Sequence, residues 1–291
     1  MTDESLRPRR SVLYMPAANA RALEKAKTIA ADALIFDLED AVAPDSKETA
    51  REQACAAAAS GDYGRRELTI RCNGLDTPWG ADDLAAAAEA GPAAVVIPKV
   101  SGAEALAEVA GRLEAAGAPD HTRIWAMVET PEAIFNAREI AAFERVAVLV
   151  MGTNDLAKEL RAELVPGRAP LVPHLATALL AAREAGTVIV DGVYNDVRDP
   201  EGFEAEARQG FELGFDGKTL VHPDQVEPAN RIWAPTEDQI ADARKVIEAF
   251  EAAQAEGKGV VTVDGRMIEN LHVDNARRSL AVAEAIAALA E

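Results

Sequence analysis

The sequence predicts an α/β protein built as a (β/α)8 TIM barrel with a C-terminal helical extension. Eight short runs rich in β-forming residues recur along the chain, and segments with helical spacing separate them. Most runs are nearly continuous in apolar residues, as expected of parallel strands that are covered on both faces. Eight strand-helix units indicate a closed barrel. A doubly wound open sheet would use the same alternation and is the structural alternative.

The elements follow one another with little interruption. The predicted strands are residues 11–15, 33–38, 67–72, 93–98, 124–129, 146–151, 187–192 and 215–221. Between them, segments such as 19–31, 44–60 and 101–117 carry Ala, Leu and Ile at helical spacing with charged residues opposite. Several of these segments open with Pro, Asp or Ser, which favour helix starts.

The pattern changes near the C-terminus. Residues 236–259 read as a long helix, 260–268 as a hairpin with an Asp-Gly turn, and 270–291 as a final helix. We therefore predict a catalytic barrel over residues 1–225 and a helix-hairpin-helix extension over 226–291. Because the extension is too short to bury a large core, we expect it to pack on its own barrel or to cover a neighbouring subunit.

Charge and composition narrow the choice of partners. The formal net charge is −19, with the acids spread over predicted helix surfaces, which disfavours nucleic acid as a partner. An anionic substrate would need local Arg or Lys groups or a bound cation. No segment approaches the ~18 consecutive apolar residues of a membrane span, and the N-terminus lacks the apolar core of a signal peptide. We expect a cytoplasmic protein whose two cysteines are reduced.

Polar residues follow most of the predicted strands. In a barrel of this class the carboxyl ends of the strands meet at one mouth, where function is concentrated. The residues expected there are Asp37, Glu39, Asp40, Arg71, Asn73, Lys99, Glu129, Asn154, Asp155, Asp191, Lys218 and His222.

The acids at this mouth indicate a metal. Several carboxylates in one place would repel each other and rise in pKa unless a cation lay among them, and all-oxygen ligands favour Mg²⁺. Glu129 and Asp155 follow neighbouring strands and are the pair we choose. Asp155 has a helix cap as its alternative role. Glu129 does not need that role, because Thr130 can cap the next helix and Pro131 can begin it.

The remaining candidates each have two interpretations. The planar fork of Arg71 suits a carboxylate or a developing enolate oxygen, but a structural ion pair with Asp37 or Glu39 is the alternative. Lys99 either binds substrate at the same site or is solvated. His222 is either a base or a satisfied structural group. The sequence has no Cys-His pairing, no Gly-x-Ser-x-Gly motif, no histidine cluster and no glycine pattern for dinucleotides or Walker-type phosphates.

Together these residues carry a resemblance to a known family. From about residue 10 to the C-terminus, the chain resembles the HpcH/HpaI aldolase and citrate lyase β-subunit-like family of Mg²⁺-dependent barrels that act on CoA thioesters. The segments that carry the resemblance are "RSVLYMPAANARALEKA", "ALIFDLEDAVAPDSKETAR", "IRCNGLDTPWGADDL", "VVIPKV", "AMVETPEAI", "VMGTNDLAKEL", "IVDGVYND" and "GFDGKTLVHPDQVEPAN".

The resemblance implies roles for the residues at the mouth. Glu129 and Asp155 would hold Mg²⁺, with Mn²⁺ as an alternative, and Arg71 would hold the carbonyl or carboxylate of the substrate. Three further acids would position waters around the metal: Asp37, Glu39 and Asp40.

The resemblance also implies contacts outside the metal site. Lys25, with help from Arg21, would bind CoA near the start of the barrel. In the family an Asp from the neighbouring subunit covers the active site, and Glu269 in "VDGRMIEN" stands at that position here. A homo-oligomer, such as a trimer or hexamer, is therefore expected.

The run from Glu269 onward is most similar to the branch of the family that hydrolyses (3S)-malyl-CoA to malate and CoA. This reaction, on (3S)-malyl-CoA or a related 3-hydroxyacyl dicarboxylic CoA thioester, is the expected function. The alternatives are cleavage of malyl-CoA or citramalyl-CoA to acetyl-CoA and a 2-oxoacid, and action on a carrier-bound citryl thioester as in the citrate lyase β subunit.

Overall fold

The chain divides into two compact units. The structure is a computed structural model that describes residues 6–255, 257 and 259–290. One unit is Arg9–Ile232, and the other combines Trp233–Glu291 with Met1–Pro8 as far as these are described. The two units divide between Ile232 and Trp233, seven residues after the boundary predicted between residues 225 and 226. Helix α10 (Val226–Ile232) belongs to the first unit because it packs on α9 and β1.

The first unit is a closed barrel of eight parallel strands, as predicted. Its strands are β1 (Ser11–Pro16), β2 (Ala33–Asp37), β3 (Glu67–Arg71), β4 (Ala94–Ile97), β5 (Arg123–Val128), β6 (Val146–Met151), β7 (Val188–Asp191) and β8 (Gly217–Leu220). Each strand pairs with the next, and β8 pairs with β1 in a register that places Ser11 opposite Lys218. This closure excludes the open sheet.

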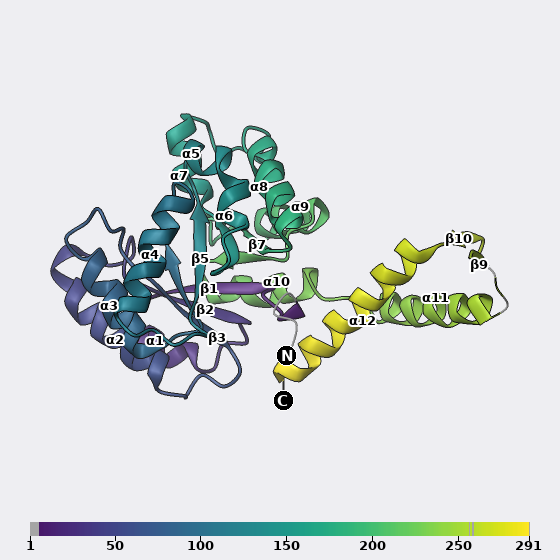
Figure 1. Cartoon of the computed structure of the whole chain (residues 1–291), viewed down its shortest axis with the longest axis horizontal. Helices are drawn as coiled ribbons and strands as arrows, with labels where there is room; N and C mark the ends of the chain where they lie inside the picture. Colours follow the sequence, from purple (N-terminus) through teal and green to yellow (C-terminus); the bar gives the residue numbers. More distant parts are fainter. Residues whose placement is uncertain (1–5, 256, 258, 291) are drawn as a thin grey trace. The chain divides into compact units, whose positions relative to one another are not determined.

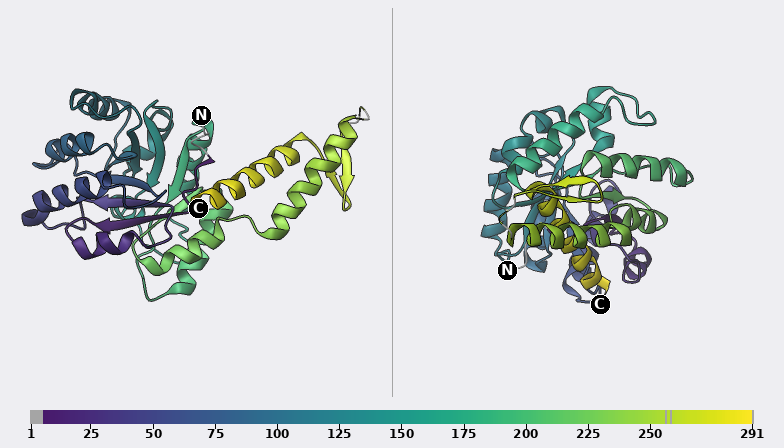
Figure 2. Two further views of the ribbon diagram at one scale, coloured as in Figure 1. Left: turned by 90° about the horizontal axis from the view of Figure 1, so that it is seen from below. Right: turned by 90° about the vertical axis from the view of Figure 1, so that its right-hand side faces the viewer.

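Helices surround the strands of the barrel (Figures 1 and 2). They are α1 (Ala20–Ala26), α2 (Lys47–Ala59), α3 (Gly80–Ala90), α4 (Ala103–Ala115), α5 (Pro131–Phe135), α6 (Ala137–Ala141), α7 (Thr153–Leu160), α8 (Val172–Ala185) and α9 (Pro200–Leu213), with short 3-10 turns η2 (Pro44–Ser46) and η3 (Pro223–Gln225). The side chains of Asn19, Thr130 and Asp199 cap α1, α5 and α9, as expected of these residue types.

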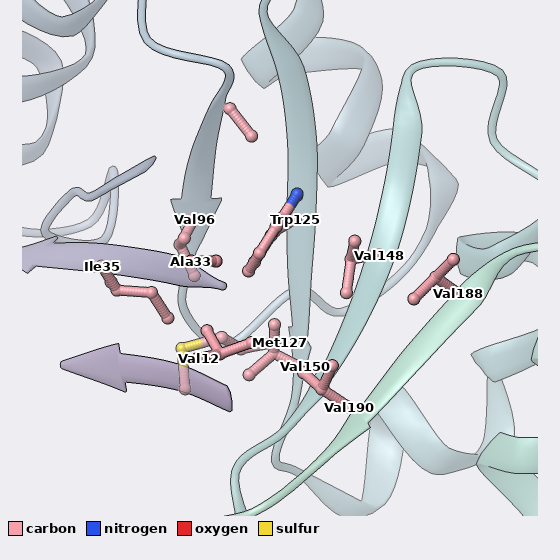
Figure 3. Packing of buried hydrophobic residues seen from close by; sticks show 11 residues of the cluster. Val12, Ala33, Ile35, Val96, Trp125, Met127, Val148, Val150, Val188 and Val190 are labelled. Carbon is pink, nitrogen blue, oxygen red and sulfur yellow. The ribbon is translucent and has the colours of Figure 1, made fainter. Parts of the chain in front are cut away.

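The barrel interior is filled by alternate residues of the strands (Figure 3). Val148 and Val150 of β6, and Val188 and Val190 of β7, belong to this core. Trp125 of β5 is fully buried in it. Because side chains alternate between the two sides of a strand, a residue two positions beyond an interior residue also points inward. This alternation, which we call the phase of a strand, decides which residues at the strand ends reach the mouth.

The second unit is built as a helix, a hairpin and a second helix. It contains α11 (Glu237–Ala255), the antiparallel strands β9 (Val261–Val263) and β10 (Arg266–Ile268), and α12 (Asn270–Ala290). Asp264 and Gly265 join the strands with φ of 49° and 78°, which is the backbone that a tight hairpin requires. The two helices pack on each other (Figure 1).

This second unit has a small core of its own. Phe250 and Val246 of α11 pack with Val263, Ile268 and Val273 of the hairpin and α12.

No helix in the described part of the chain is both long and apolar enough to cross a bilayer. Cys55 and Cys72 are free cysteines.

Candidate active site

Strand register brings Arg71 and Asp37 together at the mouth. The two residues end β3 and β2 and lie opposite each other in the sheet. Arg71 donates from Nε to Asp37 Oδ1 at 2.6 Å and from Nη2 to Oδ2 at 2.7 Å. The same carboxylate accepts the backbone N–H groups of Glu39 and Ala41. Such a two-pronged pair fixes the plane of the guanidinium, so the ion pair considered as the alternative for Arg71 is present.

The third nitrogen of the Arg71 guanidinium contacts Glu39 and Asp40, the two acids that follow Asp37 in the loop after β2. Nη1 lies 2.8 Å from Glu39 Oε2 and 3.5 Å from Asp40 Oδ2. The guanidinium also lies over the ring of Tyr14, 4.8 Å from its centroid. Tyr14 was not among the predicted residues, although its position two residues after the inward Val12 signals it. Burial raises the pKa of the Tyr14 phenol, against the opposing charge of Arg71, so the phenol stays protonated.

Glu129 lies directly after β5 and is almost fully buried. Its Oε1 accepts the backbone N–H of Lys99 at 2.7 Å. Any side chain at Gly152, which follows β6, would collide with the Glu129 carboxylate, so glycine is required there. Thr130 caps α5 as predicted. Glu129 is therefore not needed as a cap.

Asp155 lies in the first turn of α7. The N-cap position of this helix is Gly152, and no side-chain hydrogen bond caps it in the described structure. The cap considered as the alternative for Asp155 is therefore not its role. Its Oδ2 lies 3.4 Å from the ammonium of Lys99, whose side chain is half-exposed. Lys99 thus contacts Asp155 through its side chain and Glu129 through its backbone.

Burial, together with the charges of neighbouring acids, raises the pKa of two carboxyl groups at the mouth. Burial raises the pKa of Glu129 to about 7, and the charges of Glu39 and Asp155 add to the shift. Burial also raises the pKa of Glu39 to about 7, with a contribution from Asp40 and opposition from Arg71. A bound cation would relieve this repulsion.

The donor set at the mouth suits a hard divalent cation. No group of three or more His, Cys, Asp or Glu side chains in the described residues is arranged to hold a metal ion. Glu129 and Asp155 offer two carboxylates, and Mg²⁺ is commonly held by one or two carboxylates with its remaining positions left to water and substrate oxygens. The residues present therefore fit Mg²⁺.

Lys47 supports the loop after β2 and was not predicted. Its Nζ donates to the backbone carbonyls of Leu38 and Glu39 and to Asn73 Oδ1, each at 2.8 Å. Asn73, expected at the mouth, is buried and is held by Lys47 and Asp83. Lys47 lies at the start of α2, away from any strand end, so no local pattern marks it.

Two other residues expected at the mouth lie elsewhere, and that prediction was wrong. Asp191 and Lys218 lie in a buried ion cluster with Arg168 and with Glu206 of α9. Asp191 follows the inward Val190 and therefore points out of the barrel.

His222 is a structural group at the start of η3. Its ring Nδ1 accepts the backbone N–H of Asp224, and Gln225 reaches back to the His222 backbone N–H. These reciprocal bonds form a capping box, so the structural interpretation of His222 is the one that the fold supports.

The remaining predicted residues lie on two other segments. Arg21 and Lys25 are exposed on α1, which follows β1, and are one helical turn apart on the same face. Glu269 lies between β10 and α12 in the second unit, where it is exposed and its backbone carbonyl accepts the N–H of His272.

The barrel with its acidic mouth belongs to the class of (β/α)8 enzymes, whose active sites lie at the carboxyl ends of the strands. Residues 10–223 match the model of the HpcH/HpaI aldolase/citrate lyase family, and the chain belongs to this family.

Relatives in this family cover nearly the whole chain. A (3S)-malyl-CoA thioesterase from Cereibacter sphaeroides is 53% identical over 281 residues, which are 97% of this chain and 96% of the relative. The citrate lyase subunit beta of Escherichia coli is 39% identical over 98% of this chain and 96% of its own length. The crystal structure of the protein CitE from Mycobacterium tuberculosis with magnesium, acetoacetate and coenzyme A has a TM-score of 0.78 at 29% identity, and covers 94% of this chain and 97% of CitE.

Proposed function

We propose that the protein is a Mg²⁺-dependent thioesterase that hydrolyses (3S)-malyl-CoA, or a related 3-hydroxyacyl dicarboxylic CoA thioester, to malate and CoA. The observation that carries the proposal is the arrangement of Glu129, Asp155 and the bidentately held Arg71 at one barrel mouth. The (3S)-malyl-CoA thioesterase at 53% identity supports the reaction. The CitE complex with magnesium and coenzyme A supports the metal and the CoA ester.

Glu129 and Asp155 would hold the metal, with Mn²⁺ as an alternative to Mg²⁺. When bound, the divalent ion supplies positive charge that polarises a substrate oxygen. The raised pKa of Glu129 supports this assignment, because a buried carboxylate among like charges gains most from a cation. Asp37, Glu39 and Asp40 would orient waters at the same mouth.

Arg71 would bind the thioester carbonyl or the free carboxylate of the substrate. Asp37 holds two of its nitrogens, so the fork is oriented before substrate arrives, which lowers the entropy cost of binding. Lys99 would assist at the acyl group. Lys25 and Arg21 on the exposed face of α1 would bind the phosphates of CoA.

The water that attacks the thioester carbonyl needs a base, and we assign this role to Glu269 of a second copy of the chain. Glu269 would take a proton from that water as the new C–O bond forms. The C–S bond then breaks, and Glu269 returns this proton to the sulfur, so that CoA leaves as its thiol. This role requires a homo-oligomer, such as a trimer or hexamer, in which one copy covers the mouth of another. The oligomeric state and the cytoplasmic location stay predictions.

Incubation of the protein with (3S)-malyl-CoA and Mg²⁺ is expected to release free thiol without glyoxylate. The measurement follows thiol and glyoxylate in the same sample. Equal amounts of glyoxylate and acetyl-CoA would contradict hydrolysis and indicate the lyase, which the relation to the citrate lyase subunit beta makes the second candidate. If neither product forms, citramalyl-CoA and carrier-bound citryl thioesters are the substrates to test next.

Mg²⁺ affinity is expected to fall about tenfold for each pH unit below about 7. A proton and the metal compete for Glu129, whose pKa burial raises to about 7, and a protonated carboxyl does not bind Mg²⁺. Above about pH 8 the carboxylate is ionised and the affinity should level off. Calorimetric titration with MgCl₂ between pH 5.5 and 8.5 measures this. An affinity that stays constant over the whole range would contradict the assignment of Glu129.

A further inference from the structure

Lys99 has a backbone conformation that is unusual for a residue with a side chain. It follows Pro98 at the end of β4, and its φ of 48° lies in the left-handed region. That region costs roughly 1–2 kcal/mol for a residue other than glycine, and here it accompanies the hydrogen bond from the Lys99 N–H to Glu129. Glycine would adopt the same backbone without this cost. The side chain is therefore what distinguishes Lys99 from a glycine at this position.

The ammonium of Lys99 lies among the acids of the mouth. It is 3.4 Å from Asp155 Oδ2. Partial burial lowers the pKa of Lys99, but the contact with Asp155 and the charges of Glu39 and Glu129 together raise it above its usual value. These three acids come from α7, from the loop after β2 and from the end of β5. The ammonium is thus a cation already present among the residues that are proposed to hold the metal.

We propose that Lys99 is a resident counter-cation, which neutralises Asp155 in the metal-free protein and leaves Asp155 when Mg²⁺ binds. This inference rests on the proposed function. The two contacts of Lys99 are made by different groups, so the ammonium can move while the backbone N–H continues to hold Glu129. The side chain is 55% exposed and has room to turn toward solvent or substrate. Because the ammonium competes for Asp155, it lowers the affinity for Mg²⁺.

Removal of the ammonium is therefore expected to strengthen Mg²⁺ binding. At about 50 mM ionic strength, where charge effects are weakly screened, Lys99→Met should bind Mg²⁺ ~10-fold more tightly than the wild type. Lys99→Gly, which suits the left-handed backbone, should show the same gain. Lys99→Arg keeps the charge and should stay within about twofold of the wild type. Calorimetric titration with MgCl₂ measures all four proteins, and added salt should reduce the difference.

A second measurement tests the metal-free state without any substrate. In EDTA at pH 8, Lys99→Met should have a lower Tm than the wild type, because the acids lose their counter-cation, and Mg²⁺ should reverse the loss. Lys99→Arg should match the wild type. A residue that only supports the fold would lower Tm without strengthening Mg²⁺ binding.

The outcomes separate this inference from the proposed function. If the wild type binds Mg²⁺ and Lys99→Met binds it equally or more weakly, the counter-cation is overturned while the metal site stands. If neither protein binds Mg²⁺, the metal site is overturned, and the inference with it. Tighter binding by both uncharged variants, with Lys99→Arg unchanged, supports it.

Discussion

Replacement of Glu129 with glutamine is expected to lower kcat for thioester hydrolysis at least ~1000-fold. The metal is expected to contribute several kcal/mol of transition-state charge stabilisation, and each 1.4 kcal/mol is about tenfold in rate. Glutamine has the size of glutamate, and its side-chain oxygen can still accept the Lys99 N–H. The expected defect is therefore loss of Mg²⁺ binding. Steady-state kinetics over a range of Mg²⁺ concentrations and calorimetric titration measure the two effects.

The metal-free stability of Glu129→Gln distinguishes a lost ligand from a damaged fold. The folded-state pKa of Glu129 lies at about 7, above its ordinary value. Its contribution to stability is thus present below the unfolded pKa and is lost as the pH rises through about 7. At pH 8 in EDTA, Glu129 of the wild type is an ionised carboxylate in a buried position that disfavours its charge, whereas the variant carries a neutral amide there. We expect the variant to be at least as stable there. A clearly lower Tm, or activity close to wild type, would contradict the assignment.

The phase of the strands explains which parts of the site were predictable. Asp37 and Glu129 stand two residues after Ile35 and Met127, which lie in the barrel interior. Because strand side chains alternate, the sequence alone places both acids at the mouth. The prediction for Asp191 and Lys218 was wrong because it counted strand ends without their phase. Asp191 stands one residue after the interior Val190 and so faces the helices.

Other features of the site depend on tertiary contacts and have no local signal. Lys47 reaches the loop after β2 from the start of α2. Lys99 takes a left-handed backbone although its residue type gives no hint of one. Arg168 lies in the segment between α7 and α8, also with positive φ, and its partner Asp191 lies on β7. The two-residue period of strands and the 3.6-residue period of helices indicate only local structure. They cannot predict these contacts, because the contacts join segments that are distant in sequence.

Asp191, which faces the helices, is the centre of a buried ion cluster. Its carboxylate accepts two bonds from Arg168 Nη1, at 2.7 and 2.8 Å, and one from Lys218 Nζ at 3.2 Å. Glu206 is the second acid of the cluster and accepts from Lys218 at 2.8 Å. Burial alone would raise the pKa of Asp191, but Lys218 and Arg168 lower it below its usual value. Two acids and two bases balance in charge, and Asp191 and Lys218 are fully buried.

Asp191→Asn is therefore expected to destabilise the barrel by about 3–5 kcal/mol, because it leaves a net positive charge buried. Urea denaturation followed by circular dichroism and tryptophan fluorescence measures the change. Glu184→Gln is the matched control: it breaks the exposed ion pair with Arg138, which should cost less than about 1 kcal/mol.

The double variant Asp191→Asn with Lys218→Met tests the cause of this loss. It returns the cluster to one acid, Glu206, and one base, Arg168, which lie 3.7 Å apart. If the unpaired charge causes the loss, the double variant should be more stable than the sum of the two single changes predicts. Two results would contradict the role of charge balance in stabilising buried Asp191. One is that the losses in the free energy of unfolding are strictly additive. The other is that Asp191→Asn loses no more stability than Glu184→Gln.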